Sequence, residues 1–278
     1  MIKGSKYCEM SLIFLILMIL STGSYARQKI QGCTLNKPKN GVYVVAHRGA
    51  HEGIPENSLA AYRKAIDLGC DFVEIDVRTT KDGKFVSIHN STVDEYVTGP
   101  KGKVSELNLA ELRSLDIGII TGSEWKNTKI PTFEEILEIC HGKIGIYLDL
   151  KAAPVPQLVD IIKKYGMEKE ILWYISASDK KDINELKGSC PECILMADPG
   201  SEKNINATVN MFNVCVIATD MRQLSNEFVN IAHSSNTMVI TDEKEGTEAE
   251  WSNIIDWKTD GIQTDRPEEL ISFLRSHK

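Results

Sequence analysis

The chain has 278 residues and a formal net charge of −7, from 32 basic and 39 acidic side chains. This acidic balance argues against a nucleic-acid partner, because nucleic-acid phosphates attract basic surfaces. The length is compatible with one large domain, and α/β barrels often have this size.

The first 26 residues follow the pattern of a secretory signal peptide. Lys3 and Lys6 precede a short apolar run over residues 12–20, and Ser24-Tyr25-Ala26 offers a small-x-small cleavage site. The apolar run is short for a membrane span, and an uncleaved N-terminal anchor is the alternative. We therefore expect a secreted or periplasmic protein without a stable membrane span after cleavage. Residues 27–41 would lead into a single domain of residues 42–278.

From residue 42 onward, short apolar runs alternate with segments of helical period. Strands are predicted at 42–46, 72–77, 85–89, 144–150, 171–175, 194–197, 214–218, 238–241 and 261–263. Helices are predicted at 58–68, 109–115, 132–140, 155–165, 179–187, 224–233, 248–255 and 268–274. Asn57 or Ser58 can cap the first helix, and Thr132 begins a capping box.

Strands that are apolar on both faces and separated by helices predict a parallel sheet with helical cover. About eight such units over this length favour a closed (β/α)₈ TIM barrel over an open doubly wound sheet. No G-x-G-x-x-G turn follows the first strand, so a dinucleotide fold is not indicated.

One connection departs from this pattern. Asp76 and His89 are separated by only twelve residues, which include Asp82-Gly83. This is too short for a strand-helix-strand crossover, and Asp-Gly is a strong hairpin signal. We predict a shortened, helix-free connection between the second and third strands, and a regular two-residue turn would place Asp76 opposite His89.

Six cysteines lie beyond the predicted cleavage site, and only Cys190 and Cys193 are close in sequence. No second pair stands at a spacing that would complete a zinc site, so a local disulfide is the better prediction. Cys70, Cys140 and Cys215 stand in apolar stretches and are read as buried thiols.

Two acidic residues interrupt the second strand. Glu74 and Asp76 are at positions i and i+2, so both side chains point to the same face. Two neighbouring carboxylates favour a hard divalent cation, magnesium or calcium, between them. The alternative is an ion-paired strand on a wet face. Asp149 ends a later strand in the same way and could be a third ligand. Lys151 could then be a cation for an anionic substrate. Alternatively, Asp149 and Lys151 neutralise each other.

Two histidines also follow apolar strands. His47 is followed by Arg48, whose planar guanidinium suits phosphate, and by Gly49, which lets a ligand approach the backbone. His89 ends the strand F-V-S-I-H, and histidine can act as an acid or a base near neutral pH. Together with the carboxylates, these groups fit metal-assisted phosphodiester chemistry. His51, His141, His233 and His277 lack such neighbours and are read as surface or loop residues.

These residues resemble the motifs of the glycerophosphodiester phosphodiesterase family. The matching segments are His47-Arg48-Gly49, Pro55-Glu56-Asn57-Ser58, Glu74-Ile75-Asp76-Val77, Thr80-Lys81-Asp82-Gly83, His89, Leu109–Gly118, Ile130–Leu137, Asp149-x-Lys151 and Asp260–Pro267. The resemblance covers roughly residues 42–275 and is carried by the combination, since H-R-G alone is a weak signal.

The resemblance implies a barrel enzyme that uses one divalent cation to hydrolyse a glycerophosphodiester to glycerol 3-phosphate and an alcohol. It implies that Glu74, Asp76 and Asp149 bind the metal and that His47 and His89 form the acid–base pair. Arg48 and Lys151 would contact the phosphate. Asn57 would cap the first helix, with Glu56 near the metal.

Three departures from the family pattern concern the alcohol specificity more than the reaction class. Asn90 stands where Asp is usual, Asp94-Glu95 where Asp-Arg is common, and residues 238–241 replace a W-T-x-N motif. A lysophospholipase D or sphingomyelinase D-like activity on a lysolipid is the alternative enzyme. A non-catalytic barrel that binds phosphorylated ligands is the alternative from another class.

Overall fold

The structure is a computed structural model that describes residues 35–99, 101–243 and 245–277. The predicted signal peptide lies outside these residues. No helix in the described part of the chain has the length and apolar character needed to cross a membrane.

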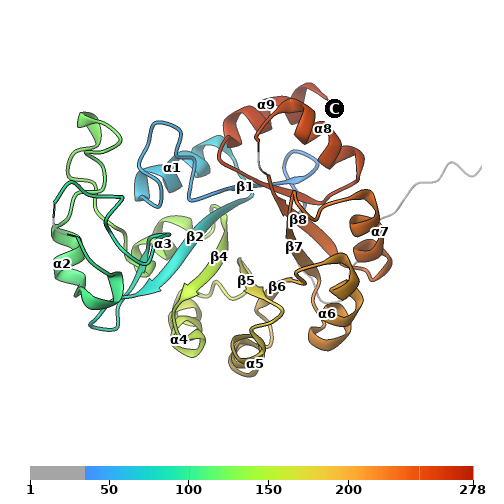
Figure 1. Cartoon of the computed structure of the whole chain (residues 1–278), viewed down its shortest axis with the longest axis horizontal. Helices are drawn as coiled ribbons and strands as arrows, with labels where there is room; N and C mark the ends of the chain where they lie inside the picture. Colours follow the sequence, from blue (N-terminus) through green and yellow to red (C-terminus); the bar gives the residue numbers. More distant parts are fainter. Residues whose placement is uncertain (1–34, 100, 244, 278) are drawn as a thin grey trace, which may run out of the picture.

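Parallel strands close into a barrel around one axis, and helices surround them (Figure 1). The sheet has nine strands, of which only β3 is antiparallel to its neighbour, so the barrel itself has eight; β1 pairs with both β2 and β9 and closes the ring. The barrel strands are β1 (Tyr43–Ala46), β2 (Phe72–Thr79), β4 (Gly145–Ala152), β5 (Ile171–Ser176), β6 (Ile194–Asp198), β7 (Val216–Asp220), β8 (Met238–Asp242) and β9 (Gly261–Thr264). The predicted (β/α)₈ TIM barrel is confirmed.

Each barrel strand is followed by a helix on the outside. These helices are α1 (Leu59–Leu68), α3 (Phe133–Cys140), α4 (Val155–Tyr165), α5 (Lys180–Ser189), α6 (Ile205–Phe212), α7 (Asn226–Ser234), α8 (Glu248–Asp256) and α9 (Pro267–Ser276). Helix α6 was not predicted, because its asparagines and threonine have low helix propensity. Its buried side chains Ile205, Thr208 and Phe212 hold it in place by packing.

Two apolar layers stabilise the barrel. One lies between the strands and the helices, and the other fills the barrel interior with side chains that alternate along each strand. Interior side chains include Val45 of β1, Phe72 of β2, Tyr147 of β4 and Met196 of β6. The side chains two residues further along each strand therefore also face the interior, at the end where the strands finish.

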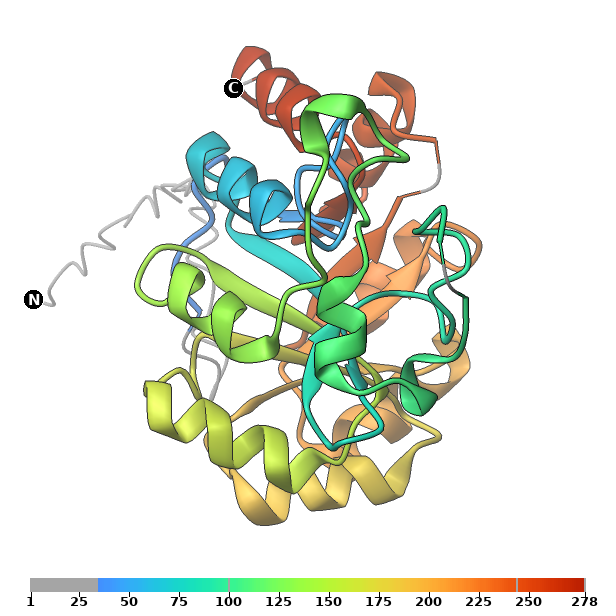
Figure 2. The ribbon, with the colours of Figure 1, turned by 90° about the vertical axis from the view of Figure 1, so that its left-hand side faces the viewer.

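A long segment between β2 and β4 lies to one side of the barrel in Figure 1 and faces the viewer in Figure 2. It contains β3 (Phe85–Ser87), the short helix α2 (Leu109–Ser114) and two 3₁₀ turns, η1 (Val104–Glu106) and η2 (Ser123–Trp125). The segment buries a small core of its own, which includes Val86, Val97 and Leu112. It brings His89 toward the carboxyl ends of the barrel strands.

The connection from β2 to β3 is helix-free, as predicted, but its register differs by one residue. Val77 pairs with Ser87 and Thr79 with Phe85, so Asp76 does not lie opposite His89. The turn has three residues between Thr80 and Lys84, because Thr80 N–H donates to the Lys84 carbonyl. Gly83 takes the left-handed conformation that such a turn requires, with φ +74°.

Local signals at two helix starts and at the close cysteine pair agree with the structure. Ser58 and Thr132 accept the expected backbone bonds from Ala61 and Glu135. Cys190 and Cys193 form a disulfide. Cys70 and Cys140 are free buried thiols as expected, whereas Cys215 is disulfide-bonded, so its reading as a thiol is wrong.

Candidate active site

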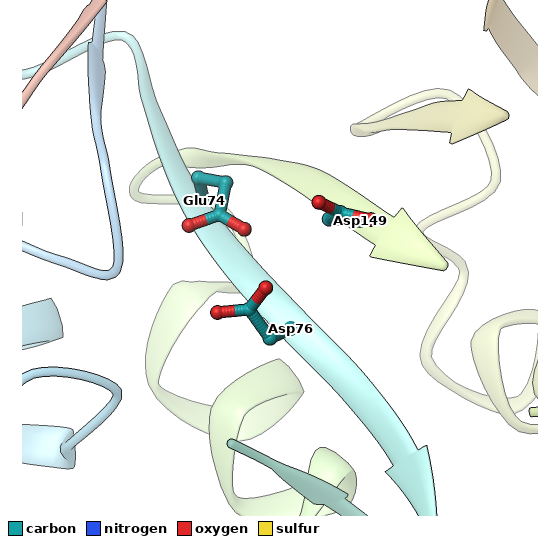
Figure 3. Close-up of side chains that lie close together, drawn as sticks. All are labelled: Glu74, Asp76 and Asp149. Carbon is teal, nitrogen blue, oxygen red and sulfur yellow. The ribbon is translucent and has the colours of Figure 1, made fainter. Parts of the chain in front are cut away.

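Three carboxylates meet at the end of neighbouring strands. Glu74 and Asp76 project from β2 and Asp149 from β4, and Figure 3 shows their carboxyl groups turned toward one another. One oxygen from each lies within 4.8 Å of the other two. Asp76 and Asp149 are paired directly across the two strands, which explains why residues 73 positions apart meet. The predicted cluster therefore exists.

Burial makes this concentration of negative charge costly. Glu74 and Asp76 are only 2% and 1% exposed. Desolvation, followed by the charges of Asp76 and Asp149, raises the pKa of Glu74 well above its usual range. Burial likewise raises the pKa of Asp149, against the opposing charge of Lys151. A cation among the three groups would offset this cost.

The cluster also fits a hard cation in its donor chemistry. All three ligands offer oxygen atoms, and Oδ1 of Asp76 is buried and makes no hydrogen bond within the described residues, with Nζ of its charged neighbour Lys151 at 3.3 Å. A buried acceptor that makes no hydrogen bond is unfavourable in the absence of a ligand. The residues present therefore fit a divalent cation.

Lys151 supplies positive charge to the same site. Its Nζ lies 2.7 Å from Oδ2 of Asp149 and 3.3 Å from Oδ1 of Asp76. Burial works to lower the pKa of Lys151, but the charges of Asp149 and Asp76 outweigh it and the pKa is raised. The alternative, in which Asp149 and Lys151 only neutralise each other, does not describe the site fully, because Lys151 also contacts Asp76.

The H-R-G motif shapes the loop after β1. Arg48 has φ +52°, and in this conformation its backbone N–H donates to Oε2 of Glu74 at 2.7 Å. Gly49 follows with φ +87°, and a Cβ there would lie 2.6 Å from the Cβ of Ala61 in α1. The glycine is thus required by the close approach of the first helix, as well as by its backbone conformation.

The Arg48 side chain bridges the carboxylate cluster and the P-E-N segment. Its Nη1 donates to both oxygens of Glu56 at 3.1–3.2 Å, and its Nε lies 3.7 Å from Oδ2 of Asp76. Burial lowers the pKa of Arg48, but Glu56 and Asp76 outweigh this effect and raise it. Glu56 therefore holds the Arg48 side chain in place.

Asn57 has a different role from the predicted helix cap, which Ser58 fulfils. Asn57 is 2% exposed, and its Nδ2 donates to Oδ2 of Asp76 at 2.7 Å. Its Oδ1 accepts from the hydroxyls of Tyr62 and Ser87 at 2.8 and 2.7 Å. This buried network orients the central carboxylate. Asn57 is part of the P-E-N-S motif, but its distance from Asp76 along the sequence did not indicate that the two side chains meet.

His47 is oriented by a carboxylate from the far end of the chain. Its Nδ1 lies 2.7 Å from Oδ1 of Asp265, which directly follows β9. Burial works to raise the pKa of Asp265, but the hydrogen bond and charge of His47 outweigh it and the pKa is lowered. Asp265 lies in the D-G-I-Q-T-D motif without having been assigned a role. His51 also approaches Asp265 at 3.6 Å, so it is not an isolated surface residue.

His89 is oriented by a neutral partner. Its Nδ1 lies 2.9 Å from Oδ1 of Asn90, and Nδ2 of Asn90 donates to Glu95 at 2.7 Å. The Arg78 guanidinium donates to the carbonyl of His89 at 2.5 and 3.0 Å and so fixes this loop against β2. Arg78 was not predicted, although it stands two residues after Asp76 on the same strand.

The remaining histidines do not join the site. His233 lies 2.8 Å from Oδ2 of Asp260, which makes it part of a structural pair. His277 contacts the end of α9, and His141 follows α3. Thus the structure brings together the seven predicted site residues at the carboxyl ends of β1, β2 and β4, with His89 supplied by the adjoining segment.

A parallel barrel with this arrangement at its C-terminal mouth defines a barrel phosphodiesterase. The model of the glycerophosphoryl diester phosphodiesterase family matches residues 47–269. A glycerophosphodiester phosphodiesterase from Caldanaerobacter subterraneus is 28% identical over 84% of this chain and 97% of its own length. The chain belongs to the glycerophosphoryl diester phosphodiesterase family and is a phosphoric diester hydrolase.

Solved structures agree with this assignment. The crystal structure of a glycerophosphodiester phosphodiesterase from Agrobacterium tumefaciens has a TM-score of 0.74 and 25% identity, covering 83% of this chain and 99% of that chain. A phosphodiesterase from Oleispira antarctica, solved with its product sn-glycerol-3-phosphate, has a TM-score of 0.75 and 21% identity, covering 84% of this chain and 96% of its own. At 21% identity, the likeness to the Oleispira antarctica structure supports the fold alone.

Proposed function

We propose that this protein hydrolyses glycerophosphodiesters to glycerol 3-phosphate and an alcohol, with Mg²⁺ or Ca²⁺ bound by Glu74, Asp76 and Asp149. The observation that carries the proposal is the convergence of these carboxylates with two histidines, an arginine and a lysine at one barrel mouth. The product bound to the Oleispira antarctica relative supports the substrate class.

The partners of the two histidines suggest their roles. Asp265 beside His47 would stabilise the imidazolium that forms when His47 accepts a proton. Asn90 beside His89 is neutral and provides no such charge, which suits a group that gives up its proton. His47 is therefore the proposed base and His89 the proposed acid.

The proposed reaction is a phosphotransfer to a neighbouring hydroxyl. His47 takes the proton of the glycerol 2-hydroxyl, whose oxygen then attacks phosphorus. The bond between phosphorus and the leaving alcohol breaks, and His89 protonates the departing oxygen. Arg48 and Lys151 stabilise negative charge on the phosphoryl oxygens, and a bound cation would add positive charge at the same atoms. Water then opens the cyclic phosphate.

Water-soluble diesters are the proposed substrates in preference to lysolipids. Among the described residues, the exposed large hydrophobic side chains are Ile120 and Met211, at 51% and 59% exposure. They lie on separate parts of the chain: Ile120 is in the segment between β2 and β4, and Met211 is in helix α6. Two separated side chains do not make the apolar surface that lipid access requires. A non-catalytic binding role is disfavoured because both histidines and all three carboxylates are retained.

We also propose that the protein is exported, secreted or periplasmic, by the signal sequence of residues 1–26. The Cys190–Cys193 disulfide supports this, since disulfides persist mainly in oxidising compartments.

The test is an assay of glycerophosphocholine, glycerophosphoethanolamine and a lysolipid with magnesium or calcium, with and without chelator. His47→Ala should lower turnover by about 10²- to 10⁴-fold, whereas His141→Ala, an exposed histidine after α3, serves as the matched control. The mechanism is wrong if chelator and His47→Ala both leave turnover unchanged. Turnover of the lysolipid alone would favour the phospholipase D activity.

A further inference from the structure

The half of the barrel mouth opposite the carboxylate cluster carries a second acidic group. Strands β6, β7 and β8 end in Asp198, Asp220 and Asp242. Side chains two and four residues earlier on each strand fill the barrel interior: Ile194 and Met196, Val216 and Ala218, Met238 and Ile240. Strand alternation therefore turns all three aspartates toward the mouth.

Only one of these aspartates forms an ion pair with a basic side chain of the described residues. Asp220 accepts hydrogen bonds from the Arg222 guanidinium at 2.5–3.2 Å. Asp198 accepts from neutral donors, the Tyr174 hydroxyl at 3.3 Å and the Gly200 N–H at 2.7 Å. Asp242 accepts from Nε2 of Gln263 at 3.1 Å; burial raises the pKa of Asp242, and the charge of His47 opposes this effect without a direct ion pair. Two carboxylates at the mouth thus form no ion pair within the described chain.

Gln263 independently indicates a missing hydrogen-bond donor. It is 6% exposed, and its Oε1 is buried without a hydrogen-bond partner among the described residues. Its register partners are Val45, which points into the barrel, and Asp242. The Gln263 amide therefore lies inside the barrel beside Asp242, and its oxygen atom accepts no hydrogen bond from the described residues. Buried acceptors are usually hydrogen-bonded to protein, to ordered water or to a ligand, so a bound group with a donor would complete this amide.

Tyr174 connects the second acidic group to the catalytic cluster. Burial, followed by the charges of Asp198, Asp149 and Asp242, raises the pKa of its hydroxyl. Its ring stands 5.7 Å from that of Tyr147 in the barrel interior. An aromatic face beside carboxylates is suited to an organic cation.

A second metal ion does not fit this group. Within residues 35–99, 101–243 and 245–277, the one set of three acidic, histidine or cysteine ligands close enough for a metal is Glu74, Asp76 and Asp149. Asp198 and Asp242 belong to no such set, so a group that carries its own hydrogen-bond donors suits these two carboxylates better than a metal ion.

We propose that Asp198, Asp242, Tyr174 and Gln263 form a subsite for the ammonium group of the substrate alcohol. A primary ammonium offers three donors, which suits two carboxylates and the free amide oxygen, whereas a quaternary ammonium offers none. The preferred substrate class is therefore a glycerophosphodiester of a primary amino alcohol, such as glycerophosphoethanolamine. This proposal rests on the proposed function of the same mouth.

The test compares kcat/KM for glycerophosphoethanolamine, glycerophosphocholine and glycerophosphoglycerol. The wild type should prefer them in that order, and Asp198→Asn and Asp242→Asn should each lower the ratio of the first to the last about tenfold, the loss of one charged hydrogen bond. Asparagine keeps the shape and one acceptor oxygen. Asp160→Asn on the exposed face of α4 removes the same charge elsewhere and should leave the ratio unchanged.

The subsite would be overturned if the kcat/KM ratio of glycerophosphoethanolamine to glycerophosphoglycerol were near one in the wild type, or if both variants left it unchanged. An equal loss for all three diesters would also overturn it, because the carboxylates would then serve the glycerol or the fold. Ethanolamine hydrochloride, compared with sodium chloride at equal ionic strength, gives a readout independent of turnover. It should raise the melting temperature of the wild type but not of Asp242→Asn. If no diester is hydrolysed while this stabilisation persists, the proposed function fails and the subsite stands.

Discussion

Asn57→Ala provides a direct test of how the central carboxylate is held. Asn57 donates to Asp76 and accepts from Tyr62 and Ser87, all within a buried network. Its backbone is also left-handed, with φ +50°. Alanine would remove all three side-chain hydrogen bonds and would be less tolerant of this conformation than asparagine.

The expected cost follows from these contacts. The bond to the Asp76 carboxylate is worth about 1.5–3 kcal/mol and the two hydroxyl bonds about 1 kcal/mol together, because without Asn57 one of the two hydroxyls, which lie 2.8 Å apart, is free to donate to the other. Backbone strain adds about 1 kcal/mol for alanine. The total, about 4 kcal/mol, corresponds to a fall in melting temperature of roughly 8–16 °C for a domain of this size.

The assay is urea denaturation and thermal melting of the wild type, Asn57→Ala, Asn57→Gly and Tyr62→Phe. Glycine removes the same side-chain bonds without the strain, so it should be about 1 kcal/mol more stable than alanine. Tyr62→Phe keeps the Asn57–Asp76 bond and should retain the stabilisation by magnesium or calcium, which Asn57→Ala should reduce. A cost below about 1 kcal/mol for alanine, or an undiminished response to the cation, would refute this account of Asp76.

Three further substitutions test separate features. Asp76→Asn should abolish the rise in melting temperature caused by the cation, and an unchanged rise would place the metal elsewhere. Gly49→Ala would put a Cβ 2.8 Å from the Ala61 carbonyl carbon, so it should cost more free energy of unfolding than Gly53→Ala, where a Cβ meets nothing within 4 Å; equal costs would contradict the close packing. Burial raises the pKa of Glu243 from 4.5 to about 7, against donors from Thr264 and Trp251. The folded state therefore holds this proton more tightly, and the wild type should lose stability relative to Glu243→Gln as the pH rises from 4.5 to 7. A difference in melting temperature that is the same at pH 5 and pH 8 would show that Glu243 does not titrate in this range.

The barrel could be predicted because its signals are local. Apolar runs such as 171–175 and helix-period segments such as 155–165 repeat along the chain, and each signal needs only neighbouring residues. Helix α6 was missed because its residues have weak helix propensity and its buried side chains hold it in place. The β2–β3 register was missed because a two-residue and a three-residue turn both fit Lys81-Asp82-Gly83-Lys84, and the Thr80–Lys84 backbone bond selects the latter.

The sequence by itself determined which groups carry the chemistry. Glu74 and Asp76 must share a face of one strand, and His47, Asp149 and Lys151 must stand near strand ends, because alternation and apolar patterning are properties of the local chain. Only the tertiary structure decided which partners orient them. Asp265 reaches His47 across 218 residues because β9 pairs with β1 to close the barrel. The pairing of β8 with β9 sets Gln263 beside Asp242, and no spacing along the chain specifies contacts between side chains of different strands.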